Sequence, residues 1–274
     1  MRSRELIIEP GRAEKQYFLD LWRYRELFYF FAWRDILVRY KQTAIGIAWA
    51  LLRPFLKMLV FTLVFGKLAK LPSEGAPYPI LVFAAMLPWQ LFTNTLMECS
   101  NSLISNANLI AKVYFPRLIV PASSVIVSVV DFMISGMILL GLMAWYDFVP
   151  TFRILTLPIF LLIALASAMG AGVWFAALNV QYRDVRYIVP FIVQFGLYVS
   201  PVGFSSQVVP QQWRLIYSLN PMVGVIDGFR WAILGGDVQI YWPGFILSLV
   251  IVGLLFSSGI WYFRRMEKTF ADVI

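Results

Sequence analysis

The chain has 274 residues, of which 60% are hydrophobic and 14% are charged. Soluble domains carry about 25% charged residues, and a soluble chain of this length could not bury so much apolar surface. The composition therefore excludes an ordinary soluble domain and predicts an integral membrane protein. Aromatic residues make up 17% of the chain and include 10 Trp, which agrees with the gathering of Trp and Tyr at membrane interfaces.

Residue types that catalysis and metal binding usually need are scarce. The chain has no His, which excludes His-based acid–base catalysis, and its single Cys99 excludes an intrachain disulfide or a multi-Cys metal site. No stretch has the phosphate-binding form G-x-x-x-x-G-K-[ST]. These absences remove several classes of catalytic and metal site, and we expect no catalytic, cofactor or metal residue in this chain.

Six apolar stretches approach the length of about 20 residues that a transmembrane helix needs. The sequence thus predicts an all-α membrane fold with six spans, and the polar residues 1–16 predict no cleavable signal peptide. The first stretch is the weakest, because Arg53, Pro54 and Lys57 interrupt it, and the fifth is short and ends at Ser200-Pro201. The stretches run near Ala44–Phe65, Pro79–Met97, Leu118–Trp145, Ile154–Leu178, Tyr187–Phe204 and Trp242–Phe263.

Basic residues are unevenly distributed between the two sides of this bundle. Sixteen of the 23 Lys and Arg residues lie in the segment up to Lys41, in the loops after the second and fourth stretches, and in the tail after the sixth. Cytoplasmic loops are enriched in Lys and Arg, so we expect both termini in the cytoplasm, in agreement with an even number of spans. The net charge of +8 then reflects membrane topology and not nucleic-acid binding.

The segment Asp20–Lys41 has too few apolar residues to span a membrane, and its periodicity predicts an amphipathic helix in the cytoplasmic interface. Aromatic and apolar residues lie on one side and most charges on the other, with Arg34 and Arg39 near anionic headgroups. A helix packed on the bundle is the alternative. The apolar side contains Trp22, Tyr29, Trp33, Ile36 and Tyr40.

Two cytoplasmic segments are candidate contacts for a soluble partner. Residues 98–117 are too polar for lipid, and their core predicts a short helix whose apolar residues dock into a groove; a connector bound only to its own bundle is the alternative. The turn Asn179–Arg186, with Arg183 and Asp184, is a second contact or simply a solvated turn. The core of the first segment carries Asn101, Leu103, Ile104, Leu109, Ile110 and Lys112.

The connection 205–241 on the outer side is long, and such loops usually have structure or function. It predicts two short helices that lie in or re-enter the outer leaflet, one starting at Asn220-Pro221 and containing Phe229 at helical spacing. These helices could cap a pathway, or the connection could be an ordinary extracytoplasmic hairpin.

Charged and aromatic residues inside the spans need an explanation. Asp131 is expected to be neutral or hydrogen-bonded, with Ser128 and Ser135 within one helical turn. Arg53 and Lys57 share a helix face and either snorkel to the interface or line a wet, cationic cavity. Aromatic stripes suit the C–H faces of sugar rings, although lipid-facing or packing roles are the alternative. The aromatic residues are Trp49, Phe55 and Phe61 in the first stretch and Phe191, Phe195 and Tyr198 in the fifth.

Several of these segments, in this order, resemble the permease subunit of bacterial ABC-2 type polysaccharide exporters, in the branch that exports O-antigen, teichoic acid and polyol-phosphate polymers. Each stretch is modest alone, and the set is specific. One departure is Arg53, because the family commonly has an uncharged residue before this proline. The matching stretches are Trp33–Trp49, Leu87–Trp89, Asn106–Arg117, Leu178–Arg186, Ser200–Val202 and Asn220–Met222.

The resemblance implies that this chain is a transport subunit and not an enzyme, and that it works in a complex in the bacterial inner membrane. Two copies of this chain would bind two ABC ATPase subunits, which hold the ATP and Mg, and would form a channel for a lipid-linked polysaccharide among membrane lipids. It further implies that Asn101–Lys112 is a coupling helix, that Asp20–Lys41 is an interface helix, and that Gln212–Leu234, with Trp213, forms outer gate helices. The expected division is an N-terminal segment 1–41, a transmembrane domain 42–265 and a tail 266–274.

Other functions remain as alternatives. An ABC-2 exporter of capsule, teichoic acid, a small lipid or a drug would share this architecture. A membrane-embedded transferase acting on a polyprenyl-phosphate carrier usually needs paired acidic catalysts with Mg²⁺, and no such pair is seen near a cytoplasmic loop. A secondary transporter is disfavoured, because inverted repeats and several intramembrane acids are missing.

Overall fold

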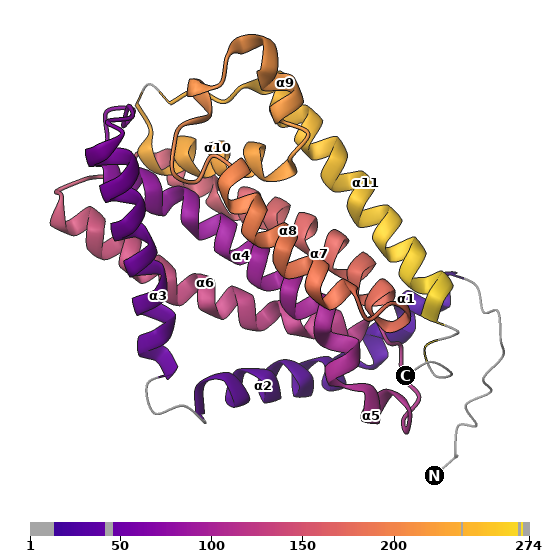
Figure 1. Ribbon diagram of the computed structural model, residues 1–274. Coiled ribbons are helices and arrows are strands. Elements are labelled where there is room, and N and C mark those ends of the chain that lie inside the picture. Colours follow the sequence, from indigo (N-terminus) through magenta and orange to yellow (C-terminus); the bar gives the residue numbers. More distant parts are fainter. Residues whose placement is uncertain (1–13, 42–45, 237, 268–269, 271–274) are drawn as a thin grey trace.

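The computed structural model describes residues 14–41, 46–236, 238–267 and 270, which form helices joined by short turns, with no β-strand among them (Figure 1). The predicted all-α fold is confirmed. Residues 1–13 and most of the predicted tail lie outside the described residues. The α-helices are α1 Glu14–Arg23, α2 Arg25–Lys41, α3 Gly46–Phe61, α4 Tyr78–Ser105, α5 Ala107–Ile110, α6 Ile119–Trp145, α7 Leu157–Gln181, α8 Val185–Val199, α9 Arg214–Tyr217, α10 Pro221–Leu234 and α11 Trp242–Met266. A π-helix, η1 Thr62–Leu68, and three 3₁₀ turns, η2 Phe152–Thr156, η3 Ser206–Val208 and η4 Gln211–Trp213, complete the set.

Helix α4 is the centre of the bundle. Every residue from Ile80 to Trp89 is buried, because α6, α7 and α10 pack around this helix (Figure 1). A helix that is apolar on all sides is stable only when it is enclosed in this way or by lipid. In this chain the protein itself encloses α4, and the other long helices keep faces for lipid or for partners.

Five helices are long and apolar enough to cross a membrane, and they correspond to the first, second, third, fourth and sixth predicted stretches. They are Ala48–Leu68, Tyr78–Ser105, Ile119–Trp145, Phe152–Gln181 and Trp242–Met266. The fifth predicted stretch is not among them: α8 ends at Val199, and the chain turns at Ser200-Pro201, as expected. With 15 residues, α8 is about 22 Å long, which is shorter than the hydrocarbon core of about 30 Å.

The first span contains the proline that weakened its prediction. Pro54 lies inside α3, and the helix continues through the π-helical segment η1 to Leu68. The expected start near Ala44 lies outside the described residues. Because η1 extends the helix, the apolar run is long enough to span despite Arg53 and Lys57.

Two glycines bring α7 and α11 into backbone contact. A Cβ atom at Gly170 would lie 2.7 Å from the Cα atom of Phe256, and a Cβ atom at Gly259 would lie 2.3 Å from the carbonyl oxygen of Gly170. Small residues allow such close helix approach in membranes, where van der Waals packing drives helix association. This contact holds the last span against the bundle.

The N-terminal and C-terminal elements lie at the same end of the bundle. One buried cluster joins Phe31 of α2, Leu103 of α4, Ile110 of α5, Val173 of α7 and Phe263 of α11. A second cluster, with the beginnings of α4 and α7 and the helix α10, fills the opposite end. We call these the α5 end and the α10 end (Figure 1).

The predicted interface helix is two helices, α1 and α2, separated at Tyr24. Helix α2 crosses the α5 end of the bundle and packs on α6 (Figure 1). The predicted aromatic side is divided: Trp22 of α1 and Tyr29 and Trp33 of α2 are exposed, whereas Tyr40 of α2 turns inward to Asp131. The structure therefore shows the packed alternative for α2, with exposed aromatic side chains left on its outer side.

Candidate functional site

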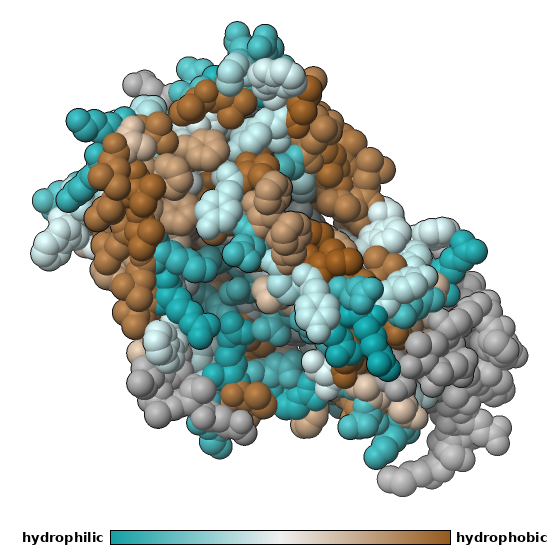
Figure 2. Space-filling view, viewed as in Figure 1, coloured by the Kyte–Doolittle hydropathy of each residue, from teal (hydrophilic) through white to brown (hydrophobic). Residues whose placement is uncertain are grey.

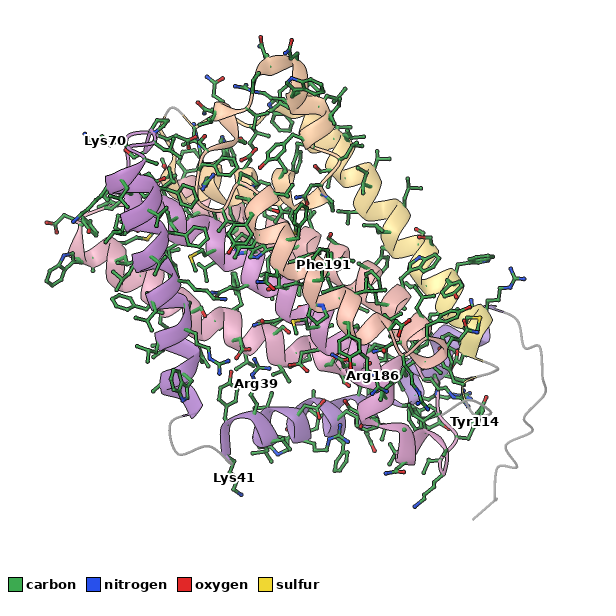
Figure 3. All side chains as sticks on the ribbon, viewed as in Figure 1. Arg39, Lys41, Lys70, Tyr114, Arg186 and Phe191 are labelled. Carbon is green, nitrogen blue, oxygen red and sulfur yellow. The ribbon has the colours of Figure 1, made fainter. Side chains whose placement is uncertain are left out.

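A charged cluster of Arg39, Tyr40, Asn94, Glu98 and Asp131 joins α2, α4 and α6. Arg39 Nη1 lies 2.8 Å from Glu98 Oε1, and Arg39 Nη2 lies 2.6 Å from Asp131 Oδ2. Tyr40 donates a hydrogen bond to Asp131 Oδ1, and Asn94 Nδ2 lies 3.4 Å from Asp131 Oδ2. A single guanidinium from α2 therefore bridges carboxylates from two spans, and Figure 3 shows Arg39 between α2 and α6.

This cluster explains how Asp131 is tolerated inside a span. Burying a carboxylate without a partner costs several kcal/mol, and here a cation and two hydrogen-bond donors surround the Asp131 side chain, which is only 11% exposed. Burial, and then the hydrogen bond to Asp131, raise the pKa of Tyr40, so its phenol stays protonated and donates. The expected hydrogen-bonded Asp131 is confirmed, but Ser128 does not supply the bond, because its hydroxyl has no partner.

The sequence prediction missed Asn94 and Glu98 as partners of Arg39 and Asp131. Their spacing of four residues places both on one face of α4, and this was the available signal. Arg39, expected near lipid headgroups, is instead held by two carboxylates. Arg34 pairs with Asp35 at 2.7 Å and lies over the Phe31 ring.

Arg53 and Lys57 are exposed on α3. Arg53 lies 5.6 Å from the ring centroid of Trp49, and among the described residues no carboxylate forms an ion pair with either cation. Figure 2 shows a hydrophilic stretch of surface between the apolar column of α3 and the front of α8. These charges therefore lie on the part of α3 that the chain itself does not cover.

Helix α8 carries an exposed aromatic stripe. Phe191, Phe195 and Tyr198 are all exposed, and the Phe191 and Phe195 rings stack with centroids 6.1 Å apart (Figure 3). Exposed Tyr187 extends the stripe by one turn and was missed by the sequence prediction. The fifth stretch therefore presents the shared face that its spacing predicted.

The aromatic residues of α3 do not form one stripe. Trp49 and Phe55 are exposed, but six residues of α-helix place them about 120° apart around the axis. Phe61 is half-buried and packs against Phe65 at 5.5 Å between centroids. Phe61 therefore lies apart from the exposed face of α3 on which we expected it.

The predicted coupling segment is arranged differently from one short helix. Asn101, Leu103 and Ile104 belong to the end of α4, and only Ala107–Ile110 form the separate helix α5. Leu103 and Ile110 are buried in the chain's own core, whereas Asn108, Lys112 and Tyr114 are exposed.

The second predicted cytoplasmic contact lies beside the coupling segment. Asn179 of α7 donates hydrogen bonds to the Ser100 carbonyl and to Asn101 Oδ1. The turn after α7 exposes Arg183 and Asp184. The structure thus brings the two predicted contacts together at one end of the bundle.

The connection 205–241 contains η3, η4, α9 and α10. Helix α10 begins at Pro221, and Asn220 caps it by accepting a bond from the Met222 amide at 3.1 Å, so the predicted helix start is confirmed. Trp213 is exposed. Phe229, expected at an outer gate, is fully buried and packs against Phe132 and Phe160, which makes it a core side chain.

Arg230 holds this end together and was not foreseen as a buried residue. Its guanidinium donates to the carbonyls of Phe204 at 2.7 Å and Val202 at 3.2 Å, and Arg230 is only 1% exposed. Asp227, one turn earlier on α10 and half-buried, lies close enough for its charge to act on Arg230. A buried arginine needs such partners, because an unpaired buried charge is costly.

Comparisons with known proteins agree with this architecture. The family model for ABC-2 type transporters matches residues 26–234. An O-antigen export system permease protein, RfbA, from Myxococcus xanthus is 27% identical over 93% of this chain and 98% of its own length. Its counterpart from Klebsiella pneumoniae is 24% identical over 88% and 92%, and the polysialic acid transport protein KpsM from Escherichia coli is 23% identical over 81% and 88%. The family model covers most of the chain, so this protein belongs to the ABC-2 type transporter family of membrane proteins.

Proposed function

We propose that this chain is the membrane subunit of an ATP-driven exporter that moves a lipid-linked polysaccharide of the O-antigen type across the bacterial inner membrane. The observation that carries the proposal is the exposed aromatic stripe of α8 beside a hydrophilic surface with exposed Arg53 and Lys57. Aromatic faces suit sugar rings, and unpaired charges inside a span mark a polar pathway. The similarity to RfbA along nearly its whole length supports this choice of cargo.

A second copy of the chain would complete the pathway. The first span, Ala48–Leu68, is only 11% buried over its most apolar stretch, compared with 78% for the span Tyr78–Ser105. The first span also carries two charges that cannot face lipid without cost. The exposed faces of α3 and α8 then meet those of the partner copy and enclose a channel. Trp49, Phe191, Phe195 and Tyr198 line it, with Arg53 and Lys57 in its wall.

An ATPase dimer would dock at the α5 end and supply the energy. This end holds α5 and the Arg183–Asp184 turn, which are linked through Asn179 and Asn101. We assign this end to the cytoplasm, where the excess of Lys and Arg predicts it. Closure of the ATPase dimer on ATP and Mg would push on α5, and α4 would carry that motion to the channel.

Reconstitution tests the proposal. The chain and its co-purifying ATPase are placed in nanodiscs, and hydrolysis is measured with and without lipid-linked O-antigen, capsular polysaccharide and teichoic acid precursors. We expect O-antigen to stimulate hydrolysis most. Stimulation by none of them, or activity of the chain without an ATPase, would contradict the proposal. The latter result would favour a polyprenyl-phosphate transferase.

Surface variants test the docking site in the same assay. The double variant Lys112→Glu/Tyr114→Ala changes only exposed side chains of the coupling segment. In this variant the ATPase should still hydrolyse ATP, but the glycan should no longer stimulate hydrolysis. Ile110 is unsuitable because it is buried in the chain's own core. Asp147→Asn, exposed near the opposite end of α6, is the matched control.

A capsular polysaccharide is the second candidate cargo, because KpsM is similar over 81% of this chain. The three-precursor comparison separates it from O-antigen. If the cargo were a small lipid or a drug, none of the three precursors would change the rate of ATP hydrolysis, and the chain would still require its ATPase.

A further inference from the structure

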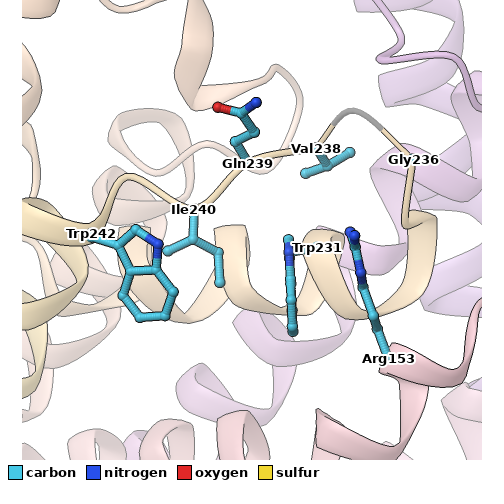
Figure 4. A pocket seen from close by; sticks show the side chains of 7 residues that line it. All are labelled: Arg153, Trp231, Gly236, Val238, Gln239, Ile240 and Trp242. Carbon is cyan, nitrogen blue, oxygen red and sulfur yellow. The ribbon is translucent and has the colours of Figure 1, made fainter.

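A cavity of about 330 Å³ opens at the α10 end, where η2 leads into α7, α10 ends and α11 begins (Figure 4). None of its lining residues belongs to α8, and it lies at the opposite end of the bundle from α5 (Figure 1). The residues that line it are Arg153, Trp231, Gly236, Val238, Gln239, Ile240 and Trp242.

The guanidinium of Arg153 is available to this cavity. It lies 5.0 Å from the centroid of the Trp231 ring, and Figure 4 shows the two side chains side by side. No described residue receives a hydrogen bond or an ion pair from Arg153, although an arginine carries five N–H donors. By contrast, Arg214 and Arg230 at the same end each donate to backbone carbonyls.

Stacking on Trp231 fixes the orientation of this cation. The indole of Trp231 in turn packs edge to face against Phe160, with centroids 6.4 Å apart. A guanidinium held flat on an aromatic face keeps its N–H edge free, and this edge matches the oxygens of a phosphate in a bidentate manner. The cavity therefore presents a preorganised donor for a phosphate group.

Exposed apolar residues neighbour Arg153 in the chain and begin α11. Trp242 is 62% exposed at the start of α11, and Phe152 and Leu155 of η2 are 81% and 79% exposed. These residues lie where two membrane-spanning helices begin, the level at which Trp side chains meet lipid headgroups. A ligand here would place a charged group on Arg153 and apolar chains beside Ile240 and Trp242.

Membrane topology alone does not explain a cation at this position. Lys and Arg are biased to the cytoplasmic side, and this end is opposite the segments that hold most of them.

We propose that Arg153, Trp231 and Trp242 form a binding site for the phosphodiester headgroup of an anionic phospholipid in the leaflet at the α10 end. The site is independent of the channel and of the ATPase. This leaflet is the outer one if the α5 end is cytoplasmic, and that orientation rests on the proposed function.

Native mass spectrometry of the purified, delipidated complex tests the site. Phosphatidylglycerol, phosphatidylcholine or inorganic phosphate is added to the wild type and to Arg153→Gln. The wild type should retain one phosphatidylglycerol molecule more than the variant for each copy of this chain. Binding at the site should be weakened roughly 10- to 100-fold in the variant, the effect of removing hydrogen bonds to a charged group. Arg153→Lys should fall between them, because an ammonium lacks the bidentate edge.

The controls separate this site from other basic surfaces. Lys67→Gln removes an exposed cation from the same end and should retain lipid as the wild type does. Equal retention by Arg153→Gln, or equal retention of phosphatidylcholine by the wild type, would overturn the proposal. Displacement of the lipid by an equal concentration of inorganic phosphate would show a phosphate site without lipid recognition and would also overturn it.

Asp237 is the neighbour of Gly236 in sequence and lies outside the described residues, so it is tested separately. Asp237→Asn should leave phosphatidylglycerol retention unchanged or raise it, since the substitution removes a negative charge next to Gly236 in the sequence. Loss of retention in this variant would overturn the proposal. None of these measurements requires transport, so their failure leaves the proposed export function standing.

Discussion

Arg39 of the helix α2 forms an ion pair of 2.6 Å with Asp131 of the span α6. The same guanidinium reaches Glu98 of α4. The helix that precedes the first span is therefore attached by charge to two spans of the bundle. Displacement of α2 would have to break this network or carry α4 and α6 with it.

The ion pair should contribute measurably to stability. Arg39→Gln is expected to lower the free energy of unfolding by about 1–3 kcal/mol, less than the 3–5 kcal/mol of a fully buried pair, because Arg39 is partly exposed. The double variant with Asp131→Asn should lose less than the sum of the single losses, with a coupling of about 1 kcal/mol or more. Thermal unfolding in detergent measures this. Arg23→Gln, in the exposed pair with Asp20, should change stability by less than about 1 kcal/mol, and additive losses at Arg39 and Asp131 would contradict the prediction.

The exposed faces of α3 and α8 should be close to a second copy. Because the single Cys99 is buried, a Cys99→Ser background gives clean cysteine probes. Single cysteines at exposed Leu52 and Leu56 of α3 and at Phe191 and Tyr198 of α8 should give crosslinked dimers in membranes. Met133 and Met137, exposed on α6, are control positions; dimers at these positions alone would place the interface elsewhere.

The α7–α11 contact should not tolerate a methyl group. Gly170→Ala would bring its Cβ to 2.7 Å from the Phe256 backbone, and overpacking of this kind typically costs about 1–3 kcal/mol. Gly253→Ala on α11 meets no atom within 4 Å and should leave the unfolding midpoint nearly unchanged. Equal midpoints for the two variants would show that the helices can separate without cost.

Asp227 should make stability depend on pH. Burial raises the pKa of Asp227 from its usual 3.8 to about 6, against the lowering effects of Ser206 and Arg230; Glu74 also raises it and Arg214 lowers it. A carboxyl whose pKa is raised by folding stabilises the protein fully below the unfolded pKa, and this contribution is lost as pH rises through the folded value.

Stability should therefore fall between about pH 4 and pH 6, by an amount on the order of 1–3 kcal/mol, and Asp227→Asn should flatten this part of the profile. Unfolding midpoints across the pH range measure the effect. The exposed Asp147→Asn should keep the wild-type slope, and an unchanged slope in Asp227→Asn would assign the pH dependence to another group.

The long spans could be read from the sequence because their apolar runs depend only on local composition. The starts and ends of α6 and α11 match the predicted stretches within a few residues, and the Asn220-Pro221 signal located α10. The fifth stretch was expected to be short and to end at Ser200-Pro201, and the chain turns there, although the apolar run itself continues to Phe204. Hydropathy does not register such a turn.

The partners of charged residues could not be obtained in the same way. Asp131 was expected to need hydrogen bonds, but its partners come from 91 residues away, for Tyr40, and 37 residues away, for Asn94. Likewise, a helical repeat cannot distinguish Phe229, which faces the core, from Phe191, which faces outward. Both choices depend on which helices pack around the residue.

The sequence by itself determined the solvent, the helical class, most of the spans and the charge asymmetry, because each follows from composition within about 20 consecutive residues. The tertiary structure decided which charges are paired, which aromatic residues remain exposed and where the coupling segment is buried. These features depend on contacts between segments that are distant along the chain, and only the packing of the helices brings those segments together.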